Sequence, residues 1–163
     1  MPPASKKKPT KNRALGFAAH RSFLTYVATV VEIEIDDQGR LTIPEMHYAV
    51  DAGQVIHPER ARAQFEGAGV FGVSCAMLGE ITAKNGVIEQ TNFDSYRLLR
   101  IDEMPIVENH IVSSLDFWGG IGEPTICVAA PAVLNAFFNA TGRRIRELPL
   151  TPERVKAALA GQT

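Results

Sequence analysis

The stretch TYVATVVEIEIDDQGRLTIPEMHYAV, residues 25–50, decides the fold class of this chain. Its first part, residues 25–35, is rich in β-branched residues and ends in an alternation of apolar and charged side chains, which is typical of a half-buried strand. The polar cluster DDQG at residues 36–39 predicts a turn, and residues 40–50 continue as a second extended segment. The two segments therefore predict a β-hairpin, the first part of an α+β fold.

A glycine-rich helix is predicted to follow the hairpin, over residues 58–78. His-Pro-Glu at residues 57–59 is typical of a helix start, because proline and an acid are both favoured in a first turn. The middle of this helix holds three glycines, Gly67, Gly69 and Gly72. Each glycine costs about 1 kcal/mol relative to alanine in a helix interior. We expect a group that approaches the helix closely to offset this cost.

Further elements are predicted along the rest of the chain. The dipeptide NG at residues 85–86 is typical of a type I′ turn between two short strands, and residues 106–112 alternate like one more strand. The segment GGIGEP at residues 119–124 leads into a mostly apolar helix over residues 125–141. A short last helix is expected with Thr151 as its N-cap.

Charge and composition limit the possible domain organisation and the possible partners of the chain. The 163 residues carry a net charge of −1, but residues 1–13 hold five lysines and arginines and no acid. Such a segment cannot bury enough apolar surface to order itself, so we expect a basic flexible tail at residues 1–13 and one folded unit over residues 14–163. No basic field covers the whole chain and no run of 18 apolar residues occurs, so neither nucleic-acid binding nor membrane insertion is expected.

The sequence gives weaker indications about the compartment. It shows no signal-peptide pattern, which favours the cytoplasm by default, or the periplasm if the chain is exported with a partner. Cys75 and Cys127 lie in apolar segments 52 positions apart, so two buried, reduced thiols are expected rather than a disulfide.

Glu123 is the first candidate site residue. It follows the turn GGIG at residues 119–122, where missing side chains allow another group to approach the backbone, and Pro124 fixes the chain directly after it. A single carboxylate held in this way points to a functional role. The alternative is that Glu123 caps the helix that follows, since an acid near a helix N-terminus is favoured by about 0.3–1 kcal/mol.

Gln64 is the second candidate, because an amide both donates and accepts hydrogen bonds and so suits a polar ligand. The alternative is an ordinary solvated glutamine. The four histidines, His20, His47, His57 and His110, form no i,i+4 pair, so no metal held by the protein's own side chains is expected. The sequence also contains no glycine-rich phosphate loop.

Four segments, read in order, closely resemble one family. They are AAHRSFLTYVATVVEIEID, YAVDAGQVIHPERARAQFEGAGVFGVSCAMLGEIT, QTNFDSYRLLRIDEMP and GGIGEPTICVAAPAVLNAFFNATGRRIRELPL. The family is the C-terminal part of the large, molybdopterin-binding subunit of the xanthine dehydrogenase/aldehyde oxidase molybdenum hydroxylases. The branch it resembles most is that of the isoquinoline 1-oxidoreductase β subunit and the bacterial aldehyde dehydrogenases. The resemblance spans residues 14–150, and the order of QxEGxxxxG before GxGEP is specific to it.

The resemblance implies a fold and roles for the candidate residues. The fold has mixed sheets, a glycine-rich helix and a second helix after the GxGEP turn. In that family the glutamate of GxGEP is the general base at the molybdenum centre, and Glu123 matches it. The glutamine of QxEG lies beside the pterin and the metal, which implies that Gln64 binds the cofactor, and Gly122 is assigned to cofactor binding with it. The implied reaction is oxidative hydroxylation of an aldehyde or an N-heteroaromatic carbon with oxygen from water.

The resemblance also implies partners. A full large subunit is several times longer, and its N-terminal part supplies most of the molybdopterin contacts. The cofactor, in bacterial members the cytosine dinucleotide form with molybdenum, is therefore expected to be held mainly by that complementary part. Electrons are implied to leave through [2Fe–2S] clusters on an iron–sulfur subunit.

Two departures and one alternative accompany the resemblance. The chain has His57-Pro58 where the family has Asn-Pro, and Ala52-Gly53 where the family has Cys-Gly or a similar pair. Neither change affects the residues assigned above. The alternative to an active part of a hydroxylase is a non-catalytic, truncated remnant or interaction module that keeps the fold without the cofactor.

Overall fold

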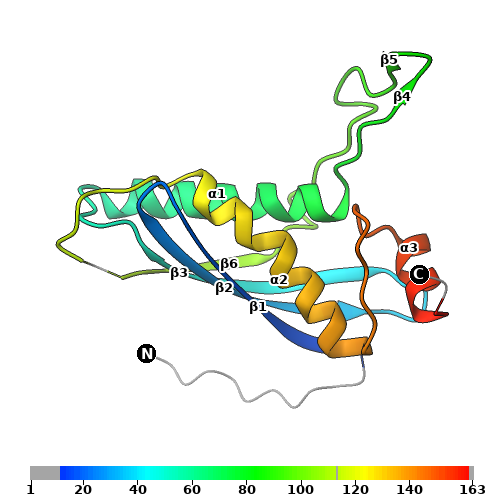
Figure 1. Ribbon diagram of the computed structural model, residues 1–163, viewed down its shortest axis with the longest axis horizontal. Coiled ribbons are helices and arrows are strands. Elements are labelled where there is room, and N and C mark those ends of the chain that lie inside the picture. Colours follow the sequence, from blue (N-terminus) through cyan, green and yellow to red (C-terminus); the bar gives the residue numbers. More distant parts are fainter. Residues whose placement is uncertain (1–11, 113, 162–163) are drawn as a thin grey trace.

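The computed structural model describes residues 12–112 and 114–161. A four-stranded sheet in the order β1-β2-β3-β6 forms one layer, and two long helices cover one of its faces (Figure 1). The strands are β1 (Arg13–Ser22), β2 (Thr25–Ile35), β3 (Leu41–Asp51) and β6 (Ile106–Ile111). The helices are α1 (Pro58–Met77), α2 (Glu123–Thr141) and the short α3 (Pro152–Leu159). A small ladder of β4 (Ala83–Lys84) and β5 (Val87–Ile88) lies on an arm that projects from this body (Figure 1).

The predicted α+β class and the β-hairpin are confirmed. Strands β2 and β3 pair antiparallel, and β6 adds to β3 in parallel. Alternate residues of β2, among them Val27, Val31 and Ile33, are buried under the helices, as the period-two pattern predicted. The opposite face of the sheet carries no helix among the described residues (Figure 1).

The sequence did not reveal strand β1, which pairs with β2 along its full length. This strand contains no β-branched residue, so local preference gives little signal. Its position is fixed by packing, because Gly16 lies directly under α2, next to the backbone of Ala132 and Ala136. Asn135 and Asn139 of α2 donate side-chain hydrogen bonds of 3.0 and 2.9 Å to carbonyls of β1. These bonds satisfy acceptors along the edge of the sheet.

The glycines of α1 have two different explanations. A Cβ on Gly69 would lie 2.8 Å from the ring of Tyr48, and one on Gly72 would lie 2.6 Å from Cβ of Ala129 in α2. These two glycines therefore let α1 pack closely on the sheet and on α2. A Cβ on Gly67 would meet nothing within 4 Å, so no packing within the described chain explains that residue.

The predicted helix boundaries are close to the observed ones. Helix α1 ends one residue before the predicted end, and α2 begins at Glu123, two residues earlier than predicted. Thr151 caps α3 by accepting a hydrogen bond from the backbone N–H of Arg154. The turn at Asn85 and Gly86 has positive φ at both residues (52° and 79°), as a type I′ turn requires.

Some expectations need correction or fall outside the described residues. Both cysteines are free, as predicted, but Cys127 is exposed and Cys75 half-buried, so the predicted burial of both is wrong. An apolar helix buries one side, and Cys127 lies on the other side of α2. Of the predicted tail, residues 1–11 lie outside the described part, and Arg13 opens β1, where it pairs with Glu32 and Glu34.

Helix α2 also meets the length and composition of a membrane span, the one helix in the described ranges that does. Its residues Val128, Val133 and Phe137 are buried against the sheet. The chain therefore uses this apolar helix as core.

Candidate functional site

The GGIG turn is tied to two other loops at one end of the sheet. The backbone N–H of Gly119 donates to the carbonyl of Ala52 (2.9 Å), and that of Gly120 donates to the carbonyl of Phe23 (2.8 Å). The buried hydroxyl of Thr25 donates to the carbonyl of Gly120 (2.6 Å). A Cβ on Gly119 would lie 2.8 Å from the carbonyl of Phe23, so this glycine is required by the chain's own packing. These contacts fix the start of α2.

Gly122 and Glu123 stand at that start. Gly122 is the N-cap and makes no side-chain cap, and a Cβ there would meet nothing within 4 Å. The first N–H groups of α2 are therefore not covered by a capping side chain, and such groups favour an anion or a polar ligand. Glu123, the first residue of the helix, is exposed, and its carboxylate has no hydrogen-bond or ion-pair partner among the described residues.

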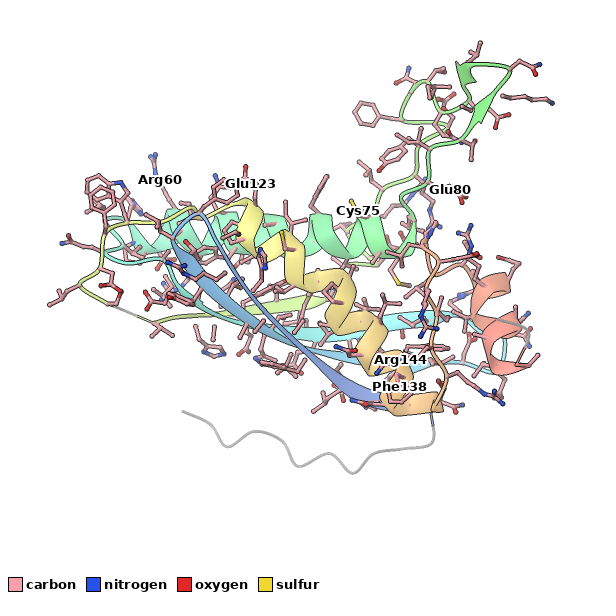
Figure 2. All side chains as sticks on the ribbon, in the orientation of Figure 1. Arg60, Cys75, Glu80, Glu123, Phe138 and Arg144 are labelled. Carbon is pink, nitrogen blue, oxygen red and sulfur yellow. The ribbon has the colours of Figure 1, made fainter. Side chains whose placement is uncertain are left out.

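Gln64 lies in the N-terminal half of α1 and is also exposed and unpaired within the described part of the chain. The two helices cross where Gly72 meets Ala129. Gln64 precedes this crossing by eight residues of α1, or about 12 Å along the helix axis. Glu123 precedes it by six residues of α2, or about 9 Å along that axis. Both stand on the N-terminal side of the crossing, and Figure 2 shows Glu123 at the end of the molecule where Arg60 of α1 also lies.

His57 shows how one departure from the family pattern is accommodated. It is the N-cap of α1, and its Nδ1 accepts a hydrogen bond of 3.3 Å from the backbone N–H of Arg60. Asparagine, the residue that the resemblance implies at this position, fills the same role in many helices. The substitution therefore preserves the start of the helix that carries Gln64.

Apolar side chains surround this end of the molecule. Phe23 and Phe117 are 67% and 70% exposed, and Ile56 and Trp118 are exposed as well. The ring centroids of Phe117 and Trp118 lie 4.8 Å apart. Isolated exposed apolar residues are common, but a group of this kind on connected loops is typical of an interaction surface.

A described groove lies elsewhere on the chain. It has a volume of about 740 Å³ and is lined by β3, the C-terminal part of α1 and the loop that carries Arg97 and Glu103. It contains none of Gln64, Gly122 and Glu123. The predicted site residues therefore lie outside this groove, and Gln64 and Glu123 are exposed.

The comparisons with known proteins decide the family. Residues 5–105 match the model of the molybdopterin cofactor-binding domain. The chain belongs to this family. It is 34% identical, over 154 residues, to the membrane-bound aldehyde dehydrogenase [pyrroloquinoline-quinone] of Gluconacetobacter polyoxogenes, covering 91% of this chain and 20% of that protein. It is 30% identical to the isoquinoline 1-oxidoreductase subunit beta of Brevundimonas diminuta, covering 92% of this chain and 19% of the relative.

A solved structure shows the same fold. Quinoline 2-oxidoreductase from Pseudomonas putida 86 superimposes with a TM-score of 0.78 at 19% identity, covering 85% of this chain and 19% of that one. The predicted resemblance and the predicted fold class are thereby confirmed. The chain spans about a fifth of the length of the curated relatives it matches. The family match includes Gln64 and ends before Gly122 and Glu123.

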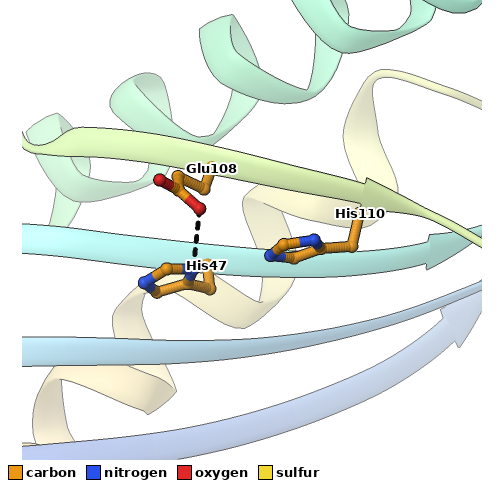
Figure 3. Close-up of side chains that lie close together, drawn as sticks. All are labelled: His47, Glu108 and His110. Carbon is orange, nitrogen blue, oxygen red and sulfur yellow. Dashed lines mark ion pairs between the residues drawn. The ribbon is translucent and has the colours of Figure 1, made fainter. Parts of the chain in front are cut away.

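Sequence reasoning missed one cluster of potential ligands. His47, Glu108 and His110 lie together on the helix-free face of the sheet, although His47 is 61 and 63 positions before the other two along the chain (Figure 3). The expectation that the histidines form no ligand group rested on sequence spacing. Spacing carries no signal here, because the register between β3 and β6 brings the three residues together.

Proposed function

We propose that this chain is one part of a molybdenum hydroxylase large subunit, an oxidoreductase that hydroxylates an aldehyde or an N-heteroaromatic carbon. In that reaction a substrate C–H becomes C–OH with oxygen from water, and two electrons leave through iron–sulfur clusters of a partner subunit. Membership of the molybdopterin cofactor-binding family supports the proposal. The observation that carries it is the exposed, unpaired carboxylate of Glu123 after an uncapped glycine.

The residues present fit a cofactor that approaches from outside the chain. Gly122 and Gly67 both face open space, in contrast to the glycines that are packed by neighbouring groups. Gln64 offers an unpaired amide one helical turn before Gly67. In the proposal, Gln64 and the first backbone N–H groups of α2 hold polar atoms of molybdopterin, in its cytosine dinucleotide form. The bound cofactor supplies the oxygen-transfer and hydride-transfer chemistry.

Glu123 acts in this proposal as the general base. An ionised carboxylate accepts a proton on one of its two Oε atoms when the donor oxygen lies within hydrogen-bond reach. The hydrogen bonds that anchor the GGIG turn fix the backbone directly before the carboxylate. Pro124 at the start of the helix further restricts the backbone next to the base.

The rest of the large subunit is proposed to cover the exposed apolar surfaces of this chain. The first such surface is the group of Phe23, Ile56, Phe117 and Trp118 next to the site. The second is the projecting arm, where Phe93 is 83% exposed. The chain spans about a fifth of the length of its relatives, and it exposes these apolar surfaces. Both observations support the proposal that the chain functions when it is docked on the complementary part of the large subunit.

Molybdenum analysis of a complex tests the proposal. The chain, carrying an affinity tag, is co-expressed with its neighbouring genes and purified, and molybdenum is measured by elemental analysis. We expect about one metal per chain in a complex with a complementary large-subunit part. A metal-free chain without partners would contradict the proposal and favour the non-catalytic remnant.

A variant separates catalysis from cofactor binding. In the reconstituted complex we expect Glu123→Gln to lower kcat by roughly 10²–10⁴-fold, as is typical for loss of a general base, while the molybdenum content stays the same. Asp37→Asn, in the exposed turn between β2 and β3, is the matched control and should leave kcat unchanged. Comparable activity in Glu123→Gln would remove Glu123 from the mechanism.

A further inference from the structure

We propose that His47, Glu108 and His110 form a binding site for a divalent transition-metal ion such as Zn²⁺, on the helix-free face of the sheet. Their ligand atoms all lie within 4.8 Å of one another. Two imidazoles and one carboxylate form a ligand set that zinc uses in proteins. This site is separate from the residues proposed to hold molybdopterin.

The register of β3 and β6 creates the cluster. His47 pairs with Glu108 across the parallel ladder, and His110 pairs with Ala49 two residues further along. Residues two apart in a strand point to the same face, so all three ligands project to one side, as Figure 3 shows. The small side chain of Ala49 leaves room beside His47 for the imidazole of His110. The two rings stack with centroids 5.8 Å apart and an interplanar angle of 8°.

The distance across the strands agrees with metal binding. Nδ1 of His47 lies 3.6 Å from Oε2 of Glu108. Ligand atoms about 2.1 Å from a tetrahedral zinc ion are about 3.4 Å apart, so this pair requires almost no movement to share one ion. Strands hold their side chains more rigidly than loops do, and such a scaffold favours a defined geometry.

Glu45 supplies a supporting carboxylate. Its Oε1 lies 2.9 Å from Nε2 of His47, the ring nitrogen on the other side from Glu108. A carboxylate that accepts the N–H of a metal-bound imidazole fixes the tautomer that directs the second nitrogen to the metal. Glu45 and Glu108 also concentrate negative charge around the two imidazoles, which favours a cation. The geometry thus assigns three residues to the metal and one to the orientation of His47.

Titration of the metal-free chain with Zn²⁺ tests the site. The full 163-residue chain, without a histidine tag and dialysed against a chelator, is titrated at pH 7.5 by calorimetry. We expect one zinc ion per chain. His47→Ala, His110→Ala and Glu108→Gln should each weaken binding at least 10-fold, and Glu45→Gln should weaken it 10–100-fold, as is typical when an outer carboxylate is lost. His20→Ala, on β1, is the matched control and should bind as the wild type does.

A second measurement distinguishes the loss of metal binding from the loss of stability in a variant. Co²⁺ in place of Zn²⁺ gives an intense visible spectrum when it is bound in tetrahedral geometry, and we expect this spectrum in the wild type and in His20→Ala but not in Glu108→Gln. Glutamine keeps the size of glutamate, so that variant should retain the circular dichroism of the wild type. Absence of zinc binding, or equal binding in all variants, would overturn the assignment. Neither readout requires molybdopterin, so failure here is distinguishable from failure of the proposed hydroxylase function.

Discussion

Gly16→Ala should destabilise the fold strongly, although it adds only one methyl group, because Gly16 is buried between the edge strand β1 and helix α2. The new Cβ would lie 2.8 Å from Cα of Ala136, and closer still to the backbone oxygen of Ala132 and nitrogen of Ala136. All three are backbone atoms of α2, so no side chain can rotate away. Ordinary contact begins at 3.4 Å, which means that β1 and α2 must separate by at least about 0.6 Å along this line.

The expected cost follows from overpacking. Insertion of one methyl group into a well-packed core costs about 1–3 kcal/mol of stability. We expect the upper end of that range here, because the new methyl group would clash with three backbone atoms of α2. A loss of about 3 kcal/mol corresponds to a fall in Tm of roughly 6–12 °C for a chain of this size. It would also lengthen the hydrogen bonds from Asn135 and Asn139 to β1.

Urea unfolding followed by circular dichroism measures this cost, and Gly67→Ala is the matched control. A Cβ on Gly67 meets nothing within 4 Å, so alanine should stabilise α1 by about 0.5–1 kcal/mol through its higher helix preference. The reasoning is refuted if Gly16→Ala unfolds within 1 kcal/mol of the wild type, or if Gly67→Ala is the more destabilising of the two variants.

Further predictions concern other contacts of the fold. Thr25→Val removes the 2.6 Å hydrogen bond to the carbonyl of Gly120 and should lower the free energy of unfolding by about 1–3 kcal/mol in the urea assay. Thr42→Val, on the exposed side of β3, is the control. Thr151→Ala removes the N-cap of α3 and should cost about 0.5–2 kcal/mol; an unchanged unfolding midpoint would show that the cap contributes nothing. Burial raises the pKa of the Tyr48 phenol, so its proton is held more tightly in the folded state. Above about pH 10, where an unfolded tyrosine ionises, the wild type should therefore lose stability faster than Tyr48→Phe, and parallel pH profiles would contradict this. The isolated chain should self-associate and bind a hydrophobic dye because of surfaces such as that around Phe117; a monomer in sedimentation without dye binding would count against the docking proposal.

The candidate site was partly predictable from the sequence. The motif placed Glu123 after a glycine turn, and the structure shows that turn and the exposed carboxylate. The reason for the glycines was not predictable, because it depends on neighbours distant in sequence. Gly119 is packed against the β1–β2 connection, whereas Gly122 faces open space. The roles of Gln64, Gly122 and Glu123 in catalysis and cofactor binding remain predictions.

The sequence by itself determined the elements that have strong local signals. The β2–β3 hairpin, the long helices and the cap at Thr151 follow from alternation, periodicity and turn residues, which act between neighbours in the chain. Tertiary structure alone decided β1, which has weak strand preference and is held by α2 and β2. It also decided the cluster of His47, Glu108 and His110, because the parallel pairing of β3 with β6 joins residues more than 60 positions apart. Local free energies select helix or strand, but register and close packing depend on contacts that form when distant segments meet.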